Sequence, residues 1–168
     1  VRVLCRRAPA IQHERLEVLL GDIRDPTVAV RAVSNCRTIV HLAAVLNSHD
    51  PAVYDVNVEG TQLLVAAAKA QGVERLVFAS TENVLPRDRD SYGQSKLEAE
   101  RIVETFGNFV ILRFTPVYGK GCSGNMARLF AMVKKNWIIP VLGNGRNRIQ
   151  PIYVGDAVAF VSAALKHG

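Results

Sequence analysis

The side chains best suited to chemistry in this sequence are a tyrosine and a lysine four residues apart. Tyr92 and Lys96 lie in a stretch, from Ser91 to about Phe106, that is typical of a helix ended by Gly107. Residues four apart share one helix face, so the phenol and the ammonium can point at the same spot. A nearby ammonium favours the phenolate and lowers the tyrosine pKa. The spacing therefore predicts a proton donor and acceptor that works near neutral pH.

The same spacing also fits a helix without chemistry. In that alternative the helix lies on the surface, Tyr92 is half-buried and Lys96 is solvated. The spacing alone does not separate the two interpretations, so the surrounding sequence has to decide between them.

The elements that must position this pair alternate between strands and helices. Asp25-Pro26 and Asp50-Pro51 each predict a helix start, with Asp as the N-cap and Pro in the first turn. Apolar strands that alternate with helices indicate βαβ units and a parallel sheet, whose ligands lie outside the carboxyl ends of the strands. The predicted strands or extended segments are 1–4, 17–20, 38–44, 75–79, 109–114, 138–142 and 149–153, and further helices are predicted at 91–106, 124–135 and 155–166.

Length, composition and charge restrict the class of protein. A chain of 168 residues, 49% hydrophobic and 21% charged, is typical of one soluble globular domain. No apolar run reaches the ~18 residues of a membrane helix. Three distant cysteines, Cys5, Cys36 and Cys122, argue against a disulfide framework or a zinc site and favour a reducing cytoplasm. The net charge of +6 is dispersed and aromatic residues are 7%, which fits an anionic small molecule better than a nucleic acid.

Seven short runs follow one another along nearly the whole chain. They are Gly-Asp-Ile-Arg-Asp (21–25), Val-His-Leu-Ala-Ala (40–44), Asn-Val-Glu-Gly-Thr (57–61), Val-Phe-Ala-Ser-Thr (77–81), Tyr-Gly-Gln-Ser-Lys (92–96), Leu-Arg-Phe-Thr-Pro-Val-Tyr-Gly (112–119) and Pro-Ile-Tyr-Val-Gly-Asp-Ala-Val (151–158). In this order they resemble the extended and atypical short-chain dehydrogenase/reductases, the NAD(P)-dependent epimerase/dehydratase-like superfamily. The resemblance implies an α/β fold with a Rossmann-like, doubly wound parallel sheet. Residues 1–168 would form a single NAD(P)-binding domain, incomplete at its N-terminus, with residues 138–168 leading into a missing substrate lobe.

The resemblance also implies roles for individual residues. Thr81 falls where the family has its catalytic Ser or Thr, whose hydroxyl binds the substrate oxygen, Tyr92 would be the acid/base, and Lys96 would activate it and hold the nicotinamide ribose. Hydride would pass between the nicotinamide and a substrate carbon that bears an oxygen. The further cofactor contacts it implies are Asp22 and Ile23 at the adenine, Leu42, Ala43 and Ala44 by close backbone approach, Asn57 from behind the site, and Pro116 and Val117 beside the nicotinamide.

Each of these positions has an ordinary structural alternative. Asp22 also fits a turn after Gly21, Thr81 the end of a strand, and Asn57 a polar residue of a helix. His41 lies inside an apolar strand, so we expect a packed core histidine rather than a ligand or a base.

Two arginines bear on the type of cofactor. An acidic residue at the end of the second family strand would hold the ribose of NAD, whereas an arginine accommodates the 2′-phosphate of NADP. The corresponding residue is Cys5, and Arg6 and Arg7 follow it. Because a guanidinium binds a phosphate through two hydrogen bonds, the sequence favours NADP(H), with NAD(H) as the alternative. Two solvated arginines at a strand end are the structural alternative.

The resemblance fails at both ends of the chain. A strand and a Gly-x-x-Gly-x-x-Gly turn that binds the pyrophosphate are expected before Val1, and the missing strand would lie between 1–4 and 38–44. We therefore expect a fragment of a longer protein or, if the chain is complete, weak or absent dinucleotide binding. In either case two hydrophobic strands would lack a shared neighbour. Near 153–154 the family's diphosphate-binding arginine falls at Ile149, with Arg148 displaced by one residue, which argues against a nucleotide-sugar substrate.

The sequence therefore predicts an NAD(P)-dependent oxidoreductase, epimerase or dehydratase of this class, acting on a small carbonyl or hydroxyl compound. The first alternative is a catalytically silent NADP(H)-binding sensor or assembly subunit. The second is an α/β binding module without a nucleotide. The presence of Thr81, Tyr92 and Lys96 together favours the enzyme. Neither nucleic acid nor a membrane is expected as a partner, and a homodimer stays possible.

Overall fold

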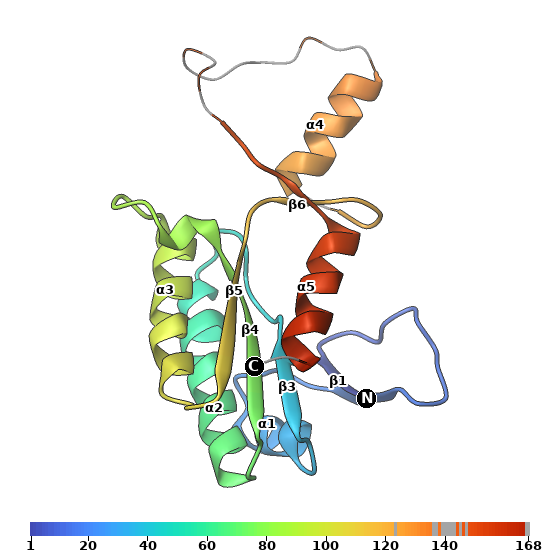
Figure 1. The fold of residues 1–168 in the computed structure, drawn as a ribbon, viewed down its shortest axis with the longest axis vertical. Helices are drawn as coiled ribbons and strands as arrows, with labels where there is room; N and C mark the ends of the chain where they lie inside the picture. The colour runs from blue at the N-terminus through green and yellow to red at the C-terminus, as the bar shows by residue number, and fades with distance from the viewer. Residues whose placement is uncertain (123, 136–137, 139–143, 145, 147, 167–168) are drawn as a thin grey trace. The chain divides into compact units, whose positions relative to one another are not determined.

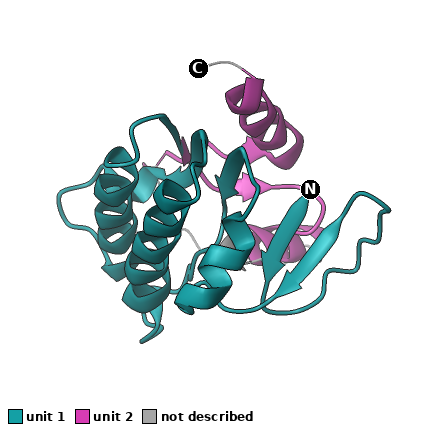
Figure 2. Ribbon diagram, turned by 90° about the horizontal axis from the view of Figure 1, so that it is seen from below, with its two compact units in different colours: residues 1–112 teal, residues 113–168 magenta. Residues whose placement is uncertain are grey.

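The computed structural model describes residues 1–122, 124–135, 138, 144, 146 and 148–166. The chain divides into two compact units, Val1–Leu112 and Arg113–Gly168, which Figure 2 distinguishes by colour. The assignment of residues 1–168 to a single domain stays a prediction.

Parallel strands carry the first unit, as predicted. β1 (Arg2–Cys5) pairs with β2 (Glu17–Leu20), and β3 (Thr38–His41) pairs with β4 (Arg75–Thr81), which also borders β5 (Phe109–Phe114). β3 is three residues shorter than predicted, because its pairing with β4 ends at His41 and Phe78 and the following residues, Leu42 and Ala43, are exposed. β4 is two residues longer than predicted, so that Thr81 is its last residue.

The strands of the first unit form two sheets rather than one. The strand orders are β1-β2 and β3-β4-β5, and β1 and β3 are not paired with each other (Figure 1). Among the described residues each of these two strands therefore borders only one neighbour. This agrees with the prediction of two strands that lack a shared neighbour.

The helices of the first unit begin at polar caps. The Asp25 carboxylate accepts hydrogen bonds from the amides of Thr27 and Val28 at the start of α1 (Pro26–Val33), as predicted. A π-helical turn, η1 (Asp55–Glu59), leads into α2 (Gly60–Ala70), and a short 3₁₀ turn, η2 (Glu82–Val84), follows β4. α3 (Ser91–Glu104) carries Tyr92 and Lys96 and has Asp90 as its N-cap.

A hydrophobic core joins α2 and α3 to one face of the β3-β4-β5 sheet (Figure 1). Leu76 and Phe78 of β4 are fully buried against Ala99 and Val103 of α3 and against Val65 of α2. A second cluster packs α1 against α2. Together these contacts fix α3 beside β4, the strand that ends at Thr81.

The second unit is described by its own elements. β6 (Val117–Tyr118) pairs in parallel with β7 (Ile152–Tyr153), and the helices are α4 (Gly124–Lys134) and α5 (Val154–Lys166). Of the extended segment predicted at 138–142, residues 139–142 lie outside the described part.

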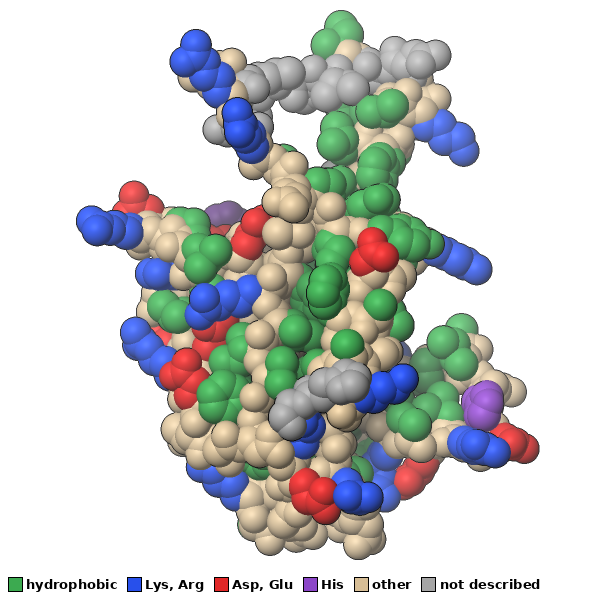
Figure 3. All heavy atoms as spheres, viewed as in Figure 1, with side chains coloured by type: hydrophobic (Ala, Val, Ile, Leu, Met, Phe, Trp, Pro, Cys, Tyr) green, Lys and Arg blue, Asp and Glu red, His purple; other side chains and the backbone are tan. Residues whose placement is uncertain are grey.

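Two surface properties bear on possible partners. No helix in the part of the chain that the structure describes is both long enough and apolar enough to span a bilayer. On the face drawn in Figure 3, Lys and Arg side chains are spread over many elements rather than gathered in one patch.

Truncation of Leu76 tests the assigned core. Leu76→Ala is expected to lower the free energy of unfolding by about 2–5 kcal/mol, because it leaves a cavity at a fully buried position. Leu85→Ala, at a residue that is 63% exposed, should change it by less than about 0.5 kcal/mol. Equilibrium urea unfolding followed by circular dichroism measures both, and equal losses would contradict the core assignment.

Candidate functional site

The carboxyl end of β4 and the first turn of α3 bring Thr81 and Tyr92 together. Thr81 is 8% exposed and Tyr92 is half-buried, and the Thr81 side chain lies close enough to the phenol to act on its pKa through hydrogen bonding. Two groups that lie 11 positions apart in the sequence therefore share one spot. A substrate oxygen at this spot would lie within reach of both hydroxyls.

Gly93 permits this close approach, a role that the sequence analysis missed. A β-carbon at Gly93 would lie only 2.5 Å from the carbonyl oxygen of Asn83, in the 3₁₀ turn directly after Thr81. The Gly93 amide also donates to the Asp90 carboxylate at 2.8 Å, which caps α3. The position directly after Tyr92 must therefore lack a side chain for α3 to begin so close to the end of β4. A glycine inside an otherwise helical run was the available signal.

Lys96 is buried behind the hydroxyl pair rather than solvated. Its side chain is 2% exposed, its Nζ donates to the Ala79 carbonyl oxygen at 2.7 Å, and the Nζ lies 3.9 Å from the centroid of the Phe78 ring. This excludes the alternative of a surface helix with a solvated lysine. Burial lowers the pKa of Lys96 to about 7, and the Glu100 carboxylate opposes that shift.

The predicted electrostatic effect of Lys96 on Tyr92 is wrong for this structure. The pKa of Tyr92 is raised, mainly because the phenol is buried and also because Asp90 lies nearby, while the hydrogen bond with Thr81 opposes the rise. The Lys96 ammonium donates to the Ala79 carbonyl oxygen and lies over the Phe78 ring. Sequence spacing placed both residues on one helix face but did not reveal which way a flexible lysine side chain turns.

Polar side chains behind the site are themselves hydrogen-bonded. Asn57, which is 1% exposed, exchanges two hydrogen bonds with the backbone of Val45 in the loop after β3. His41 is a packed core histidine, as predicted: it is 3% exposed and its Nε2 lies 2.9 Å from the Thr61 hydroxyl. Burial, together with the Lys96 charge, lowers the pKa of His41 to about 3, so His41 is neutral.

The residues implied to bind the adenine have other contacts in the structure. Both carboxylate oxygens of Asp22 bind the Arg24 guanidinium, at 3.0 and 2.8 Å, and this pair lowers the pKa of Asp22 to about 2. The Ile23 side chain is 7% exposed within the core and lies against Gly60. Ile23 could therefore reach a ligand mainly through its backbone, and the adenine contact stays a prediction for both residues.

The loop after β3 and the end of β1 are accessible to a ligand. Leu42 and Ala43 are exposed and Ala44 is partly exposed, which leaves the backbone of this loop open to close approach. Arg6 and Arg7 are exposed directly after β1, and the charge of Arg6 contributes to the low pKa of Asp22. The ends of β1 and β2 thus carry Arg6 and Asp22 near one another.

The two residues predicted to border the nicotinamide belong to the second unit. The Pro116 carbonyl oxygen accepts a hydrogen bond from the Ile152 amide, and Val117 lies in β6. Their contact with a cofactor stays a prediction.

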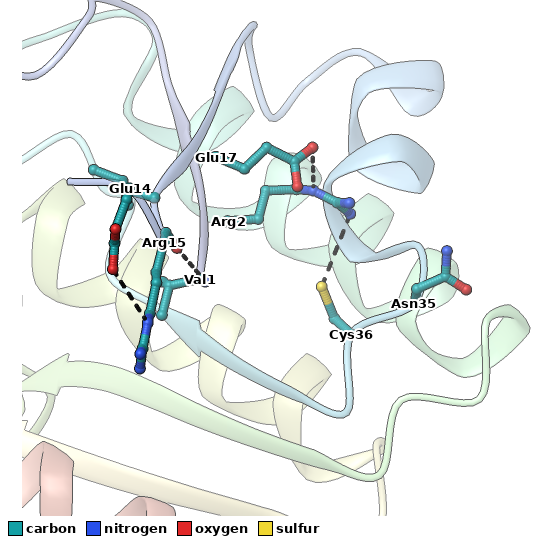
Figure 4. Close-up of a pocket in the computed structure, with 8 residues that line it drawn as sticks. Val1, Arg2, Glu14, Arg15, Glu17, Asn35 and Cys36 are labelled. Carbon is teal, nitrogen blue, oxygen red and sulfur yellow. Dashed lines mark hydrogen bonds and ion pairs between the residues drawn. The ribbon is translucent and has the colours of Figure 1, made fainter. Parts of the chain in front are cut away.

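A hollow of about 430 Å³ lies at the opposite, amino ends of β1 and β2, away from these residues. Its charged side chains pair with each other, Arg2 with Glu17 at 3.0 Å and Arg15 with Glu14 at 3.8 Å (Figure 4). None of the predicted site residues lines it. Ligands of parallel α/β sheets bind at the carboxyl ends, so this hollow is not the candidate site.

The burial of Lys96 predicts a pH dependence of stability. Its folded pKa of about 7 lies below the ordinary 10.5, so between these values the unfolded chain binds a proton that the folded chain does not. Stability should therefore rise by up to about 1.4 kcal/mol per pH unit from pH 7 to 10 because of Lys96 alone. Below pH 7 the full penalty is present. Urea unfolding at several pH values should show a flatter dependence for Lys96→Met than for the parent.

Lys69 supplies the matched control. It is exposed on α2 and its Nζ binds the Thr105 hydroxyl, so Lys69→Met should keep the slope of the parent. Equal slopes for the parent and Lys96→Met would contradict the lowered pKa.

Solved structures share this fold. MoeE5 in complex with UDP-glucuronic acid and NAD is 28% identical, with a TM-score of 0.85, and the match covers 99% of this chain and 64% of that protein. UDP-glucose 4-epimerase of Thermotoga maritima, at 21% identity, has a TM-score of 0.84 over 99% of this chain and 65% of its own. Because the second identity is low, it supports the Rossmann-like fold alone.

Two curated relatives are similar in sequence. N-acetyl-alpha-D-glucosaminyl-diphospho-ditrans,octacis-undecaprenol 4-epimerase of Escherichia coli O157:H7 is 31% identical over 88% of this chain and 51% of its own length. 3 beta-Hydroxysteroid dehydrogenase/Delta 5-->4-isomerase of Mycobacterium tuberculosis is 30% identical over 94% of this chain and 52% of its own. The chain thus spans about half the length of the curated relatives it matches. The model of the NAD dependent epimerase/dehydratase family matches residues 1–168, and this chain belongs to that family.

Proposed function

We propose that this chain supplies the proton-transfer site of an NAD(P)-dependent oxidoreductase, epimerase or dehydratase. The observation that carries the proposal is the close approach of the first turn of α3 to the carboxyl end of β4, at Gly93 and Asn83, which brings Tyr92 to Thr81 while Lys96 is buried against Ala79. The substrate would be a secondary alcohol or the corresponding carbonyl compound. One curated relative is named as an epimerase of a lipid-linked amino sugar and another as a steroid dehydrogenase. Amino-sugar and steroid alcohols are therefore the first substrate classes to test.

The residues of the site have separable roles in this proposal. Tyr92 holds its proton in the free protein, because its pKa is raised, and so serves first as the acid that protonates a substrate oxygen. Thr81 hydrogen-bonds the same oxygen and orients it toward the phenol. Lys96 provides a positive charge that favours the reverse transfer when its ammonium turns from Ala79 toward the phenol. The nicotinamide, when bound, supplies or accepts the hydride.

Two observations support a dinucleotide in this proposal, one at each of its ends. At the nicotinamide end, the buried Ser80 hydroxyl next to Thr81 has no hydrogen-bond partner among the described residues, so an unused polar group remains there. At the adenine end, Arg6 and Asp22 lie at neighbouring strand ends. A Gly-x-x-Gly-x-x-Gly turn for the pyrophosphate is not among these 168 residues, so the proposal assigns no residue to the pyrophosphate.

A second candidate function rests on the contacts of Lys96. A silent NADP(H)-binding sensor or assembly subunit would keep Lys96 bound to Ala79 and would not need a titrating Tyr92. The bond of Lys96 to Ala79 favours this alternative, whereas the approach of Thr81 to Tyr92 favours the enzyme. The two functions differ in what removal of the Tyr92 hydroxyl does to turnover: the enzyme should lose activity, whereas a silent subunit has no activity to lose.

Removal of the Tyr92 hydroxyl separates these functions. In the protein expressed from its complete reading frame, oxidation of NADH and NADPH is followed with carbonyl compounds, and product analysis detects epimerisation of hydroxyl compounds. Tyr92→Phe should lower kcat/KM by about 10²- to 10⁴-fold, because the proton donor is lost. Tyr54→Phe removes a hydroxyl from a partly exposed tyrosine and should leave the rate unchanged. Equal rates for Tyr92→Phe and the parent would contradict the enzymatic proposal.

We also propose that NADP(H) is preferred over NAD(H) through Arg6 and Arg7. In a binding titration, Arg6→Ala and Arg7→Ala together should weaken NADPH binding by about 10- to 100-fold, because hydrogen bonds to the 2′-phosphate are charge-assisted. NADH binding should change far less. Arg87→Ala, at an exposed arginine in the loop before α3, is the matched control. A parent that binds NADH more tightly, or equal losses for both cofactors, would overturn the preference.

A further inference from the structure

Hydrogen bonds of two buried side chains connect the loop after β3 to the first turn of α3. The Asn57 side chain, within the π-helical turn η1, accepts from the Val45 amide at 2.8 Å through Oδ1. Its Nδ2 donates to the Val45 carbonyl oxygen at 3.0 Å and to the Ser95 Oγ at 2.9 Å. The Ser95 hydroxyl donates to the Tyr92 carbonyl oxygen at 2.8 Å. Asn57 is 1% exposed and Ser95 0%; the bond between them is buried, and the bonds to Val45 and Tyr92 are partly buried.

The direction of every bond in this group is fixed by the backbone. The Val45 amide can only donate and the Val45 carbonyl can only accept, which determines which Asn57 atom faces each of them. The second Nδ2 hydrogen must then go to Ser95, so Ser95 accepts there. The single Ser95 proton is left for the Tyr92 carbonyl oxygen. All the hydrogens of both polar side chains are therefore used, and no alternative arrangement satisfies them equally.

The backbone of Asn57 is held from the other side. The Thr61 hydroxyl donates to the Asn57 carbonyl oxygen at 2.6 Å, so it can only accept from His41. His41 thus carries its proton on Nε2 and donates to Thr61. Asn57 is anchored to β3 through these two residues, and Ser95 is what joins it to α3.

We propose that Ser95 is a positioning residue for Tyr92. Through the Tyr92 carbonyl oxygen and the Asn57 amide, it holds the helical turn that carries the phenol at a fixed place relative to Val45 and the loop 42–44. This inference rests on the proposed function, in which Tyr92 transfers the proton, and on the predicted approach of that loop to the cofactor. A helical serine can satisfy its hydroxyl by donating to the backbone carbonyl oxygen three residues earlier, and it needs no second hydrogen bond for that. Ser95 makes that bond and accepts a second one from another element.

Hydrogen exchange in the protein without cofactor tests the link itself. Ser95→Ala leaves one buried Asn57 hydrogen unpaired, so exchange of the Val45 amide should accelerate by about 5- to 150-fold. The Leu76 and Val103 amides in the core report global unfolding and should accelerate less than Val45. Equal acceleration at all three amides would show only a loss of stability and would overturn the proposal.

Two matched substitutions sharpen this result. Ser91→Ala, at an exposed serine of the same helix, should leave the Val45 exchange rate unchanged. Ser95→Thr keeps the hydroxyl and should restore slow exchange at Val45. A double-mutant cycle on the exchange rate of the Val45 amide should show that Ser95→Ala causes little further acceleration once Asn57→Ala is present. Additive effects would mean that Ser95 does not act through Asn57.

A measurement on the parent protein covers the case in which Ser95→Ala does not fold. Both Asn57 side-chain amide hydrogens should exchange slowly in NMR spectra, and one should lie close to the Ser95 hydroxyl by nuclear Overhauser effect. Rapid exchange of either hydrogen would overturn the proposal.

Kinetics extend the test to catalysis. Ser95→Ala should lower kcat by about 10- to 100-fold with little change in KM, because a displaced phenol impairs proton transfer more than binding. If Tyr92→Phe has no effect on turnover, the proposed function fails, while the exchange data still decide whether Ser95 links the two elements. If Tyr92→Phe is inactive and Ser95→Ala retains the parent kcat, the positioning role is wrong and the function stands.

Discussion

The burial of the Lys96 ammonium between α3 and β4 is the constraint on which the site depends. A charge in this position needs an acceptor, and the Ala79 carbonyl oxygen, the Phe78 ring face and the Glu100 carboxylate together provide its surroundings. Ala79 and Phe78 are consecutive residues of β4, so the contact of Lys96 with them fixes the position of α3 along that strand. A shift of α3 by one turn would leave the charge without its acceptor.

That register has a direct consequence for the hydroxyl pair. Tyr92 lies one helical turn before Lys96, and Thr81 lies two residues after Ala79, so the fixed lysine places both hydroxyls at the carboxyl end of β4. Gly93 removes the side chain that would otherwise keep α3 away from the turn after Thr81. The end of β4, the start of α3 and the buried charge of Lys96 thus all require the same arrangement of the two elements. Such agreement between local and tertiary preferences is what defines a unique, rigid site.

The sequence predicted those features that depend on local physics. Asp25 as an N-cap, the bounds of β2 and β5, and His41 as a core histidine were all confirmed, because capping, strand patterning and burial of a residue in an apolar run are short-range effects. The order of the seven family-like runs also predicted the family correctly. Thr81 and Tyr92 were expected together from that resemblance, and the structure brings the end of β4 and the start of α3, which carry them, close to each other.

Features that depend on tertiary packing could not be read in this way. The spacing of Tyr92 and Lys96 suggested a lowered phenol pKa, but the direction of the lysine side chain is decided by Ala79 and Phe78, which come from another element. The π-helical turn before α2, which carries Asn57, has no recognisable sequence signal, and Ser95 gains its meaning only from a partner 38 positions away. Polar residues inside helices look alike in sequence whether they face solvent or a buried amide.

The protonation of Lys96 in the folded chain tests this account most directly. Lysine labelled with ¹³C at the ε-carbon gives one NMR signal per residue, and the signal that disappears in Lys96→Met identifies the buried side chain. Its chemical shift should titrate with a midpoint of about 7, well below the ordinary 10.5, because the ammonium is buried behind Thr81 and Tyr92. A midpoint near 10.5 would mean that the lysine is solvated, and it would contradict both the register of α3 on β4 and the site built on it.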